Sequence, residues 1–147
     1  MAVKTFKNRF LLIFSVSLIL WACRRDQHPI PEVFVDIYVS LNIPSSLPLQ
    51  NPGGAIHHEG GYKGLIIYRR FLSNRSDDFA VFDRACPVHW DQSCGRVSIN
   101  EDMMYGSCAC DSAQYLLYDG SAIGDNESVP LKFYRVRYHG NSLHIFN

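Results

Sequence analysis

The sequence predicts an all-β domain, either an antiparallel β-sandwich or a small barrel. An apolar i, i+3, i+4, i+7 pattern, the mark of an amphipathic helix, nowhere persists for three turns. Instead, short runs of β-branched and aromatic residues recur at close spacing, separated by turns rich in Gly, Asn and Asp. Such runs form antiparallel sheets that pack face to face or close on themselves.

The first half of the domain contains three strand candidates and one long loop. Residues 33–39 (VFVDIYV) are rich in the β-branched and aromatic side chains that favour strands. Residues 64–68 (GLIIY) and 79–82 (FAVF) are apolar throughout and are joined by the polar segment 73–78, so we expect two consecutive strands there. Residues 44–63 contain four glycines and three prolines and are predicted to form a long loop.

Polar turns organise the second half into hairpins. Asn100-Glu101-Asp102 separates one pair of strand candidates, His139-Gly140-Asn141-Ser142 separates another, and Asp119-Gly120 ends a single run. The strand candidates, in chain order, are residues 96–99, 103–105, 115–118, 133–138 and 143–146.

The N-terminus has the features of an export signal. Basic residues at positions 4, 7 and 9 precede an apolar run at residues 10–20 (FLLIFSVSLIL). A helix needs about 20 apolar residues to cross a bilayer core of roughly 30 Å, so this shorter run predicts a signal peptide rather than a membrane anchor. We therefore assign residues 1–22 to a signal peptide.

The segment Leu20-Trp21-Ala22-Cys23 at the end of this run resembles the lipobox of bacterial lipoproteins. The resemblance implies cleavage after residue 22 and lipidation of Cys23, which would anchor the protein in the cell envelope, at the outer membrane or the periplasmic face in a Gram-negative cell. The alternative is an ordinary signal peptide with an unmodified thiol at Cys23. Residues 23–32 are polar and contain two prolines, so they are predicted to be a lipid-linked tether, with the domain at 33–147.

Charge and motif content argue against several classes of function. The sequence has 14 basic and 14 acidic residues, and loss of the three basic signal residues leaves 14 − 3 = 11 against 14, a net charge near −3. The mature chain has no basic stripe, so nucleic acid is not expected as a partner. The sequence also has no Ser-His-Asp arrangement, glycine-rich phosphate loop or paired-carboxylate motif. We therefore expect no catalytic residue and no enzyme activity beyond electron transfer.

Four cysteines of the predicted domain, at positions 86, 94, 108 and 110, lie within 25 residues of one another. In the oxidising environment that an exported protein meets, such a cluster favours disulfides or a metal site. Four cysteines allow three full pairings, and their spacing does not choose among them. The residues are also compatible with a zinc site made by Cys86, His89, Cys108 and either Cys110 or Asp111, because thiolate and imidazole are zinc ligands.

The segments 86–94 (CPVHWDQSC) and 108–115 (CACDSAQY) resemble the two cluster-binding loops of Rieske [2Fe–2S] domains. In that family each loop supplies one cysteine and one histidine to the cluster, which transfers one electron to or from a redox partner. The resemblance extends over about residues 65–146 and implies a Rieske-like β-sandwich or barrel with both metal-loop hairpins at one end. It places Cys86 and Cys108 at thiolate ligand positions, and Cys94 and Cys110 at the positions of a bridging disulfide.

The histidine positions depart from the family pattern. His89 lies one residue later than the first histidine ligand, Asp111 replaces the second, and Ser112 replaces the glycine that follows it. A carboxylate is harder than imidazole and carries a charge. We therefore predict a cluster-free, non-catalytic domain with a binding or structural role, in which Cys86 and Cys108 form a second disulfide and Asp111 points to solvent. The alternatives are a Rieske-type electron carrier and a zinc-stabilised module.

The remaining histidines are expected to have structural or surface positions. His57, His58 and Glu59 can bind metal in principle, but no third ligand lies at a useful spacing, so we expect them in an exposed loop. His139 is predicted to be a turn residue and His144 a strand-surface residue.

Overall fold

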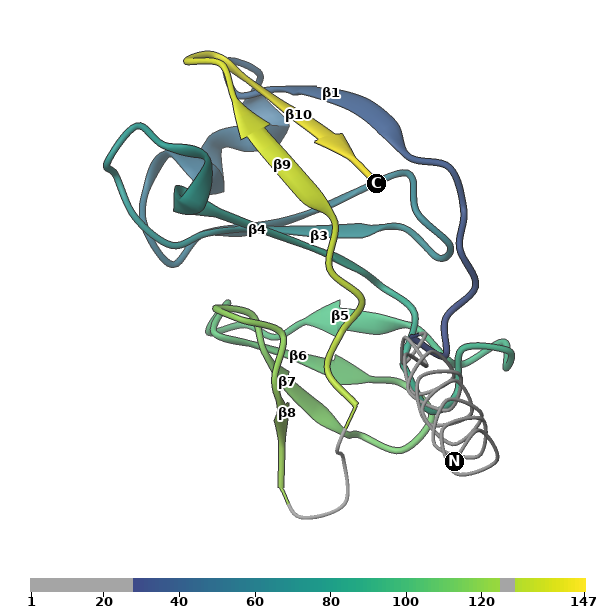
Figure 1. Cartoon of the computed structure of the whole chain (residues 1–147). Helices are drawn as coiled ribbons and strands as arrows, with labels where there is room; N and C mark the ends of the chain where they lie inside the picture. The colour runs from purple at the N-terminus through teal and green to yellow at the C-terminus, as the bar shows by residue number, and fades with distance from the viewer. Residues whose placement is uncertain (1–27, 125–128) are drawn as a thin grey trace, which may run out of the picture.

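The computed structural model describes residues 28–124 and 129–147, so the predicted signal peptide and Cys23 lie outside the described residues. Figure 1 shows the arrangement of the strands and short 3₁₀ helices. In chain order these elements are β1 (Asp36–Ser40), η1 (Pro44–Gln50), β2 (Ala55–His58), β3 (Leu65–Arg69), η2 (Ser76–Asp78), β4 (Phe79–Asp83), β5 (Val97–Ile99), β6 (Tyr105–Cys108), β7 (Gln114–Leu116), β8 (Ala122–Ile123), β9 (Arg135–Tyr138) and β10 (Ser142–Phe146). No helix within these described ranges is long and apolar enough to cross a membrane.

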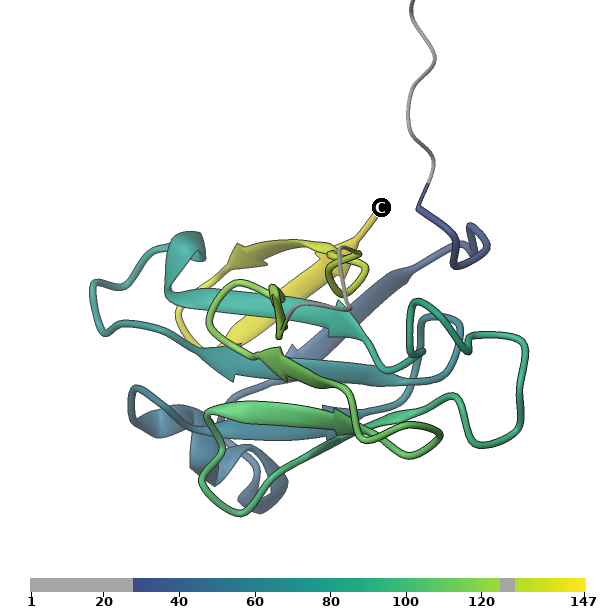
Figure 2. The same cartoon turned by 90° about the horizontal axis from the view of Figure 1, so that it is seen from below.

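The strands form three antiparallel sheets, and the predicted all-β class is confirmed. The strand orders are β1-β10-β9, β2-β3-β4 and β5-β6-β7-β8. In Figure 1, β3 and β4 lie between the sheet that ends the chain and the sheet of β5 to β8, and Figure 2 shows the same layers from below. The β2-β3-β4 sheet is therefore the central layer of the domain.

The central sheet is buried on both faces. Successive side chains of a strand point to opposite faces, and here each face has its own apolar core. Leu65 and Ile67 pack in one core with residues of β1 and β10, whereas Ile66 packs in a second core with Cys108 of β6 and Tyr115 of β7. This double burial explains why β3 and β4 have continuous apolar sequences instead of the alternation of a half-exposed strand.

The structure corrects the prediction of a long loop at residues 44–63. This segment contains η1 and β2, and β2 pairs with β3 from Ala55↔Tyr68 to His58↔Leu65. Glycine and proline are frequent on both sides of the four-residue strand β2, so the sequence does not reveal it. Its conformation is fixed by hydrogen bonds to β3 rather than by its own composition. The two-residue strand β8 also has no signal in the sequence.

Residues 28–32, which the sequence analysis assigned to the tether, pack against the domain. Ile30 is only 1% exposed. The Nζ of Lys132 donates a hydrogen bond of 2.7 Å to the carbonyl oxygen of Pro31 and lies 3.3 Å from the Glu32 carboxylate. The folded part of the chain therefore extends upstream of residue 33, because an apolar side chain and two backbone carbonyls in this polar segment find partners on the domain.

Candidate functional site

Two loops carry the cysteines and the candidate ligands. The first loop leaves β4 and is closed by a β-bridge between Ala85 and Arg96. The second loop joins β6 to β7 at residues 109–113. Because Val97 at the start of β5 pairs with Cys108 at the end of β6, both loops emerge at the same end of the β5–β8 sheet.

The four cysteines form two disulfides between these loops. Cys94 is bonded to Cys110, as the resemblance to Rieske loops implied, and their Cα atoms are 5.1 Å apart. Cys86 is bonded to Cys108 with a Cα–Cα distance of 5.8 Å, as predicted for a domain without a cluster. The second bridge is part of the apolar core, since Cys86 and Cys108 are 0% and 2% exposed. Two disulfides in one small domain indicate an extracytoplasmic protein.

Removal of the Cys94–Cys110 disulfide is expected to destabilise the domain. Replacing both Cys94 and Cys110 with serine should lower the free energy of unfolding by about 3 kcal/mol, because the bridge closes a chain segment of 16 residues in the unfolded state. Cys94 is exposed, so little packing is lost with it. Urea unfolding under non-reducing conditions measures the difference, and an unchanged midpoint and slope would show that the bridge contributes no stability.

His89 and Asp111 meet between the loops. The imidazole Nε2 of His89 lies 2.9 Å from an oxygen of Asp111, and the side-chain amide of Gln92 lies 3.1 Å from Nδ1. A neutral imidazole that donates from Nε2 and accepts at Nδ1 satisfies both contacts. Asp111 is exposed, as predicted, and its carboxylate also contacts His89. Its side chain is 31% exposed and turns toward His89, because the imidazole offers a hydrogen bond across the gap between the loops.

Ser112 adopts the left-handed backbone conformation that its position requires. Its φ is +62°, in the region that glycine occupies without strain. The second loop thus keeps a tight turn after Asp111 although glycine is absent. The turn is stabilised locally by Asp111, whose other carboxylate oxygen accepts a hydrogen bond of 3.0 Å from the N–H of Ala113.

The donor set of the loops does not fit a [2Fe–2S] cluster or a zinc ion. A Rieske cluster needs two thiolates and two imidazoles, and zinc at these positions needs free thiolates. Here Cys86 and Cys108 are bonded to each other, and the loops contain one histidine, which is hydrogen-bonded to Asp111. Among the described residues, no group of three or more His, Cys, Asp or Glu side chains is arranged to hold a metal ion.

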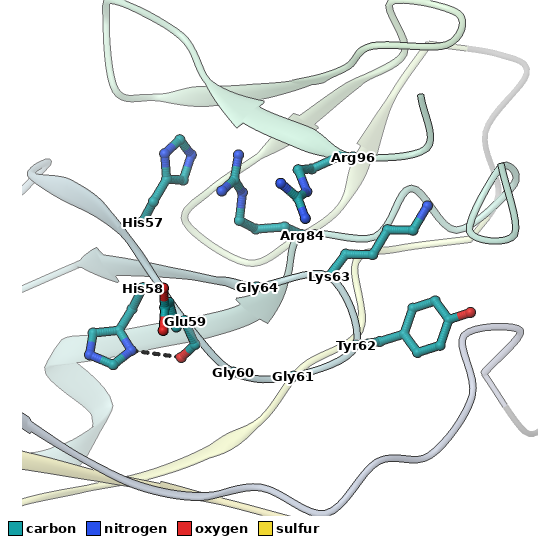
Figure 3. A pocket seen from close by; sticks show the side chains of 10 residues that line it. All are labelled: His57, His58, Glu59, Gly60, Gly61, Tyr62, Lys63, Gly64, Arg84 and Arg96. Carbon is teal, nitrogen blue, oxygen red and sulfur yellow. Dashed lines mark hydrogen bonds between the residues drawn. The ribbon is translucent and has the colours of Figure 1, made fainter. Parts of the chain in front are cut away.

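A basic pocket at the base of the first loop was not predicted from the sequence. It has a volume of about 520 Å³ (Figure 3). His57 and His58, expected in an exposed loop, belong to β2 and line this pocket. The residues that line it are His57, His58, Glu59, Gly60, Gly61, Tyr62, Lys63, Gly64, Arg84 and Arg96. The sequence signal was weak, because the two arginines flank the first loop at a separation of twelve positions and only the β-bridge beside them brings them together.

The two C-terminal histidines lie away from the loops. His139 follows β9 in the turn before β10, as predicted. His144 lies on β10, where its ring stacks on Tyr38 with a centroid distance of 4.4 Å and its Nε2 lies 2.6 Å from the Asp36 carboxylate. These contacts join β10 to β1 and account for His144 as a structural residue.

Comparison with known proteins gives a fold. No protein-family model and no curated protein sequence matches the chain. Among solved structures, the chain is similar to the cyanobacterial plasma membrane Rieske protein PetC3 from Synechocystis PCC 6803, with a TM-score of 0.53 at 14% identity, over 74% of this chain and 99% of that chain. The fold is Rieske-like. The ferredoxin of carbazole 1,9a-dioxygenase from Nocardioides aromaticivorans IC177 is also similar, with a TM-score of 0.45 at 14% identity, over 78% of this chain and 98% of that chain. Structural similarity at such low sequence identity shows the fold alone, so the function must be argued from the site itself.

Proposed function

We propose that the chain is an exported, lipid-anchored envelope protein whose Rieske-like domain holds no [2Fe–2S] cluster and has a binding or structural role. The observation that carries the proposal is the Cys86–Cys108 bond, which occupies both thiolates that would bind one iron. The pairing of Asp111 with His89 supports it, because the position of the second imidazole is filled by a carboxylate that already has a partner. Each of these features replaces a cluster contact with a contact between protein atoms.

Protein purified without air is expected to be colourless and to contain neither iron nor acid-labile sulfide. A thiol assay under denaturing, non-reducing conditions should find no free cysteine among residues 86–110, since all four form disulfides. The measurements are the visible absorption spectrum, the metal content and the thiol count. A coloured protein with iron and sulfide in equal amounts would overturn the proposal in favour of a one-electron carrier, and bound zinc would favour the zinc-stabilised module.

A variant that restores the family spacing tests the reason for the missing cluster. Deletion of Val88 moves the histidine to the second position after Cys86, and Asp111→His supplies the second imidazole. Val88 is 51% exposed, so its deletion removes little buried surface. After reduction and reconstitution with iron and sulfide, this double variant should acquire a Rieske-type spectrum that the wild type lacks. The matched control is Asp111→Asn with the same deletion, which has no second imidazole and should stay colourless.

The proposed lipid anchor can be tested separately by the mass of the mature protein. Intact-mass analysis of the native protein should find residues 1–22 removed and the mass of acyl chains on Cys23, because Leu20-Trp21-Ala22-Cys23 resembles a lipobox. Arg24 follows the modified cysteine, in place of the aspartate associated with inner-membrane retention, so we expect outer-membrane sorting in a Gram-negative host. An unmodified Cys23, or cleavage at another bond, would contradict the anchor while leaving the prediction about the cluster intact.

A further inference from the structure

The pocket at the base of the first loop gathers positive charge. Lys63, Arg84 and Arg96 all line it, although the predicted mature chain has a small excess of acidic residues. Figure 3 shows the guanidinium groups of Arg84 and Arg96 close together, next to the ring of His57. A concentration of cations in a concave site favours an anionic ligand.

The backbone holds Arg84 in place. The N–H of Arg84 donates to the carbonyl oxygen of Gly64 at 2.9 Å, and its side-chain Nε donates to the carbonyl oxygen of Val97 at 3.0 Å. Gly64 has a φ of +103°, and a Cβ at this position would lie 3.0 Å from the Cδ of Arg84. The glycine therefore allows the arginine side chain to lie across the β2–β3 turn, with its terminal nitrogens directed toward the pocket.

Among the described residues, no carboxylate pairs with either arginine of the pocket. Within residues 28–124 and 129–147, neither Arg84 nor Arg96 forms an ion pair with a carboxylate, and Glu59, the acidic residue of the pocket lining, pairs with neither. Burial and then the charge of Arg96 lower the pKa of Arg84. Burial, followed by the charges of Arg84 and Arg96, lowers the pKa of His57. Two cations held together without a partner carry a repulsion that a bound anion would relieve.

His57 offers a further donor to such an anion. The backbone N–H of Ile99 donates to its Nε2 at 3.3 Å, so a neutral ring carries its proton on Nδ1. The pocket thus combines an imidazole N–H with two guanidinium groups. The ammonium group of Lys63 points away from them and donates to the carbonyl oxygen of Gln92 (Figure 3). Guanidinium groups bind the oxygens of phosphate in a forked geometry, and several donors together suit a doubly charged group better than a single carboxylate.

We propose that this pocket binds a phosphate group, through Arg84 and Arg96 with His57 beside them. The volume of about 520 Å³ leaves room for the molecule that carries the group. Phosphate would be the ligand of the binding role proposed above. The biological meaning of the site rests on that role, but phosphate binding itself does not. The two proposals fail separately, because metal content tests the absence of a cluster and phosphate binding tests the pocket.

The test is a titration of the full-length protein, purified in a non-ionic detergent, with inorganic phosphate at constant ionic strength. Calorimetry should find saturable binding of one phosphate per chain, and NMR should detect shifts of the His57 ring signals while those of His144 stay in place. Arg96→Gln should weaken binding about tenfold or more, since a hydrogen-bonded charge pair is worth at least about 1.4 kcal/mol. Arg96 is exposed, so this variant is expected to fold.

The matched control is Arg135→Gln, which removes one exposed guanidinium from β9 in another sheet and should leave phosphate binding unchanged. A water-soluble short-chain phosphatidate distinguishes the sources of the phosphate. Tighter binding than inorganic phosphate assigns a lipid headgroup, and weaker binding assigns a soluble phosphate. Absence of saturable binding in the wild type, or equal weakening by the two arginine variants, would overturn the proposal.

Discussion

Replacing Asp83 with alanine is expected to lower the free energy of unfolding by about 3–5 kcal/mol, because several buried donors lose their acceptor at once. Asp83 is fully buried at the end of β4. Its carboxylate accepts hydrogen bonds from the backbone N–H groups of Tyr62 (2.5 Å), Lys63 (3.1 Å) and Ala85 (2.8 Å) and from the hydroxyl of Tyr134 (2.9 Å). Alanine removes the acceptor that all four donors share.

The matched control is Tyr134→Phe, which removes one donor and keeps the carboxylate with its three backbone partners. A single hydrogen bond to a charged group predicts a loss of about 1.5 kcal/mol. Burial and the adjacent Asp83 carboxylate raise the pKa of Tyr134 above its ordinary range, so its hydroxyl stays a donor at any pH used for the measurement. Urea unfolding of both variants gives the comparison, and equal losses would mean that the backbone contacts of Asp83 contribute nothing.

Asp83 also fixes the relative position of the two functional features. It contacts the β2–β3 turn, which forms one wall of the basic pocket, and the first residue of the disulfide loop. Gly61 lies against it so closely that a Cβ would be 2.6 Å from the carboxylate oxygen, and its φ is +62°. In a destabilised but folded Asp83→Ala protein, phosphate binding at the pocket should therefore weaken as well.

The fold and the loop chemistry were predictable because their signals are local. The short apolar runs between polar turns are properties of consecutive residues and predicted the all-β class, whereas the Rieske-like topology and the two disulfides were implied by the resemblance of the two cysteine segments to Rieske loops. The contact between Asp111 and His89 was not predicted, because the two residues lie 22 positions apart on different loops.

The basic pocket and the Asp83 contacts could not be read from the sequence because they depend on non-local pairing. Strand β2 is recognisable only from its hydrogen bonds with β3, and without it His57 has no defined place. Arg84 and Arg96 look like ordinary surface residues until the bridge between Ala85 and Arg96 brings them together. Asp83 ends an apolar strand and would be expected at the surface, yet the backbone N–H groups of a distant turn keep it buried.

A second large effect is expected at the buried ion pair between Arg69 and Asp78, whose side chains are 5% and 0% exposed and 3.3 Å apart. Asp78→Asn should cost about 3–5 kcal/mol, because it leaves the buried Arg69 guanidinium without a counter-charge. Asp78 also accepts hydrogen bonds from the N–H groups of Ser73 (2.9 Å) and Arg75 (3.3 Å). The matched control is Asp77→Asn, one residue away, whose ion pair with Arg75 is exposed and should be worth less than about 1 kcal/mol.

The same carboxylate makes the stability depend on pH in acid. Burial alone would raise the pKa of Asp78, but hydrogen bonds from Ser73 and Arg75 and the charge of Arg69 outweigh it and lower the pKa below its ordinary value. The stability from the ionised carboxylate is therefore fully present above the unfolded-state pKa of about 3.9 and is lost as the pH falls through the lower, folded-state pKa. Urea midpoints measured from about pH 6 down to about pH 2 should fall steeply in the wild type and in Asp77→Asn. Asp78→Asn should show a shallower fall, since it lacks the group whose protonation costs stability, and an equally steep fall would assign the acid sensitivity to other carboxylates.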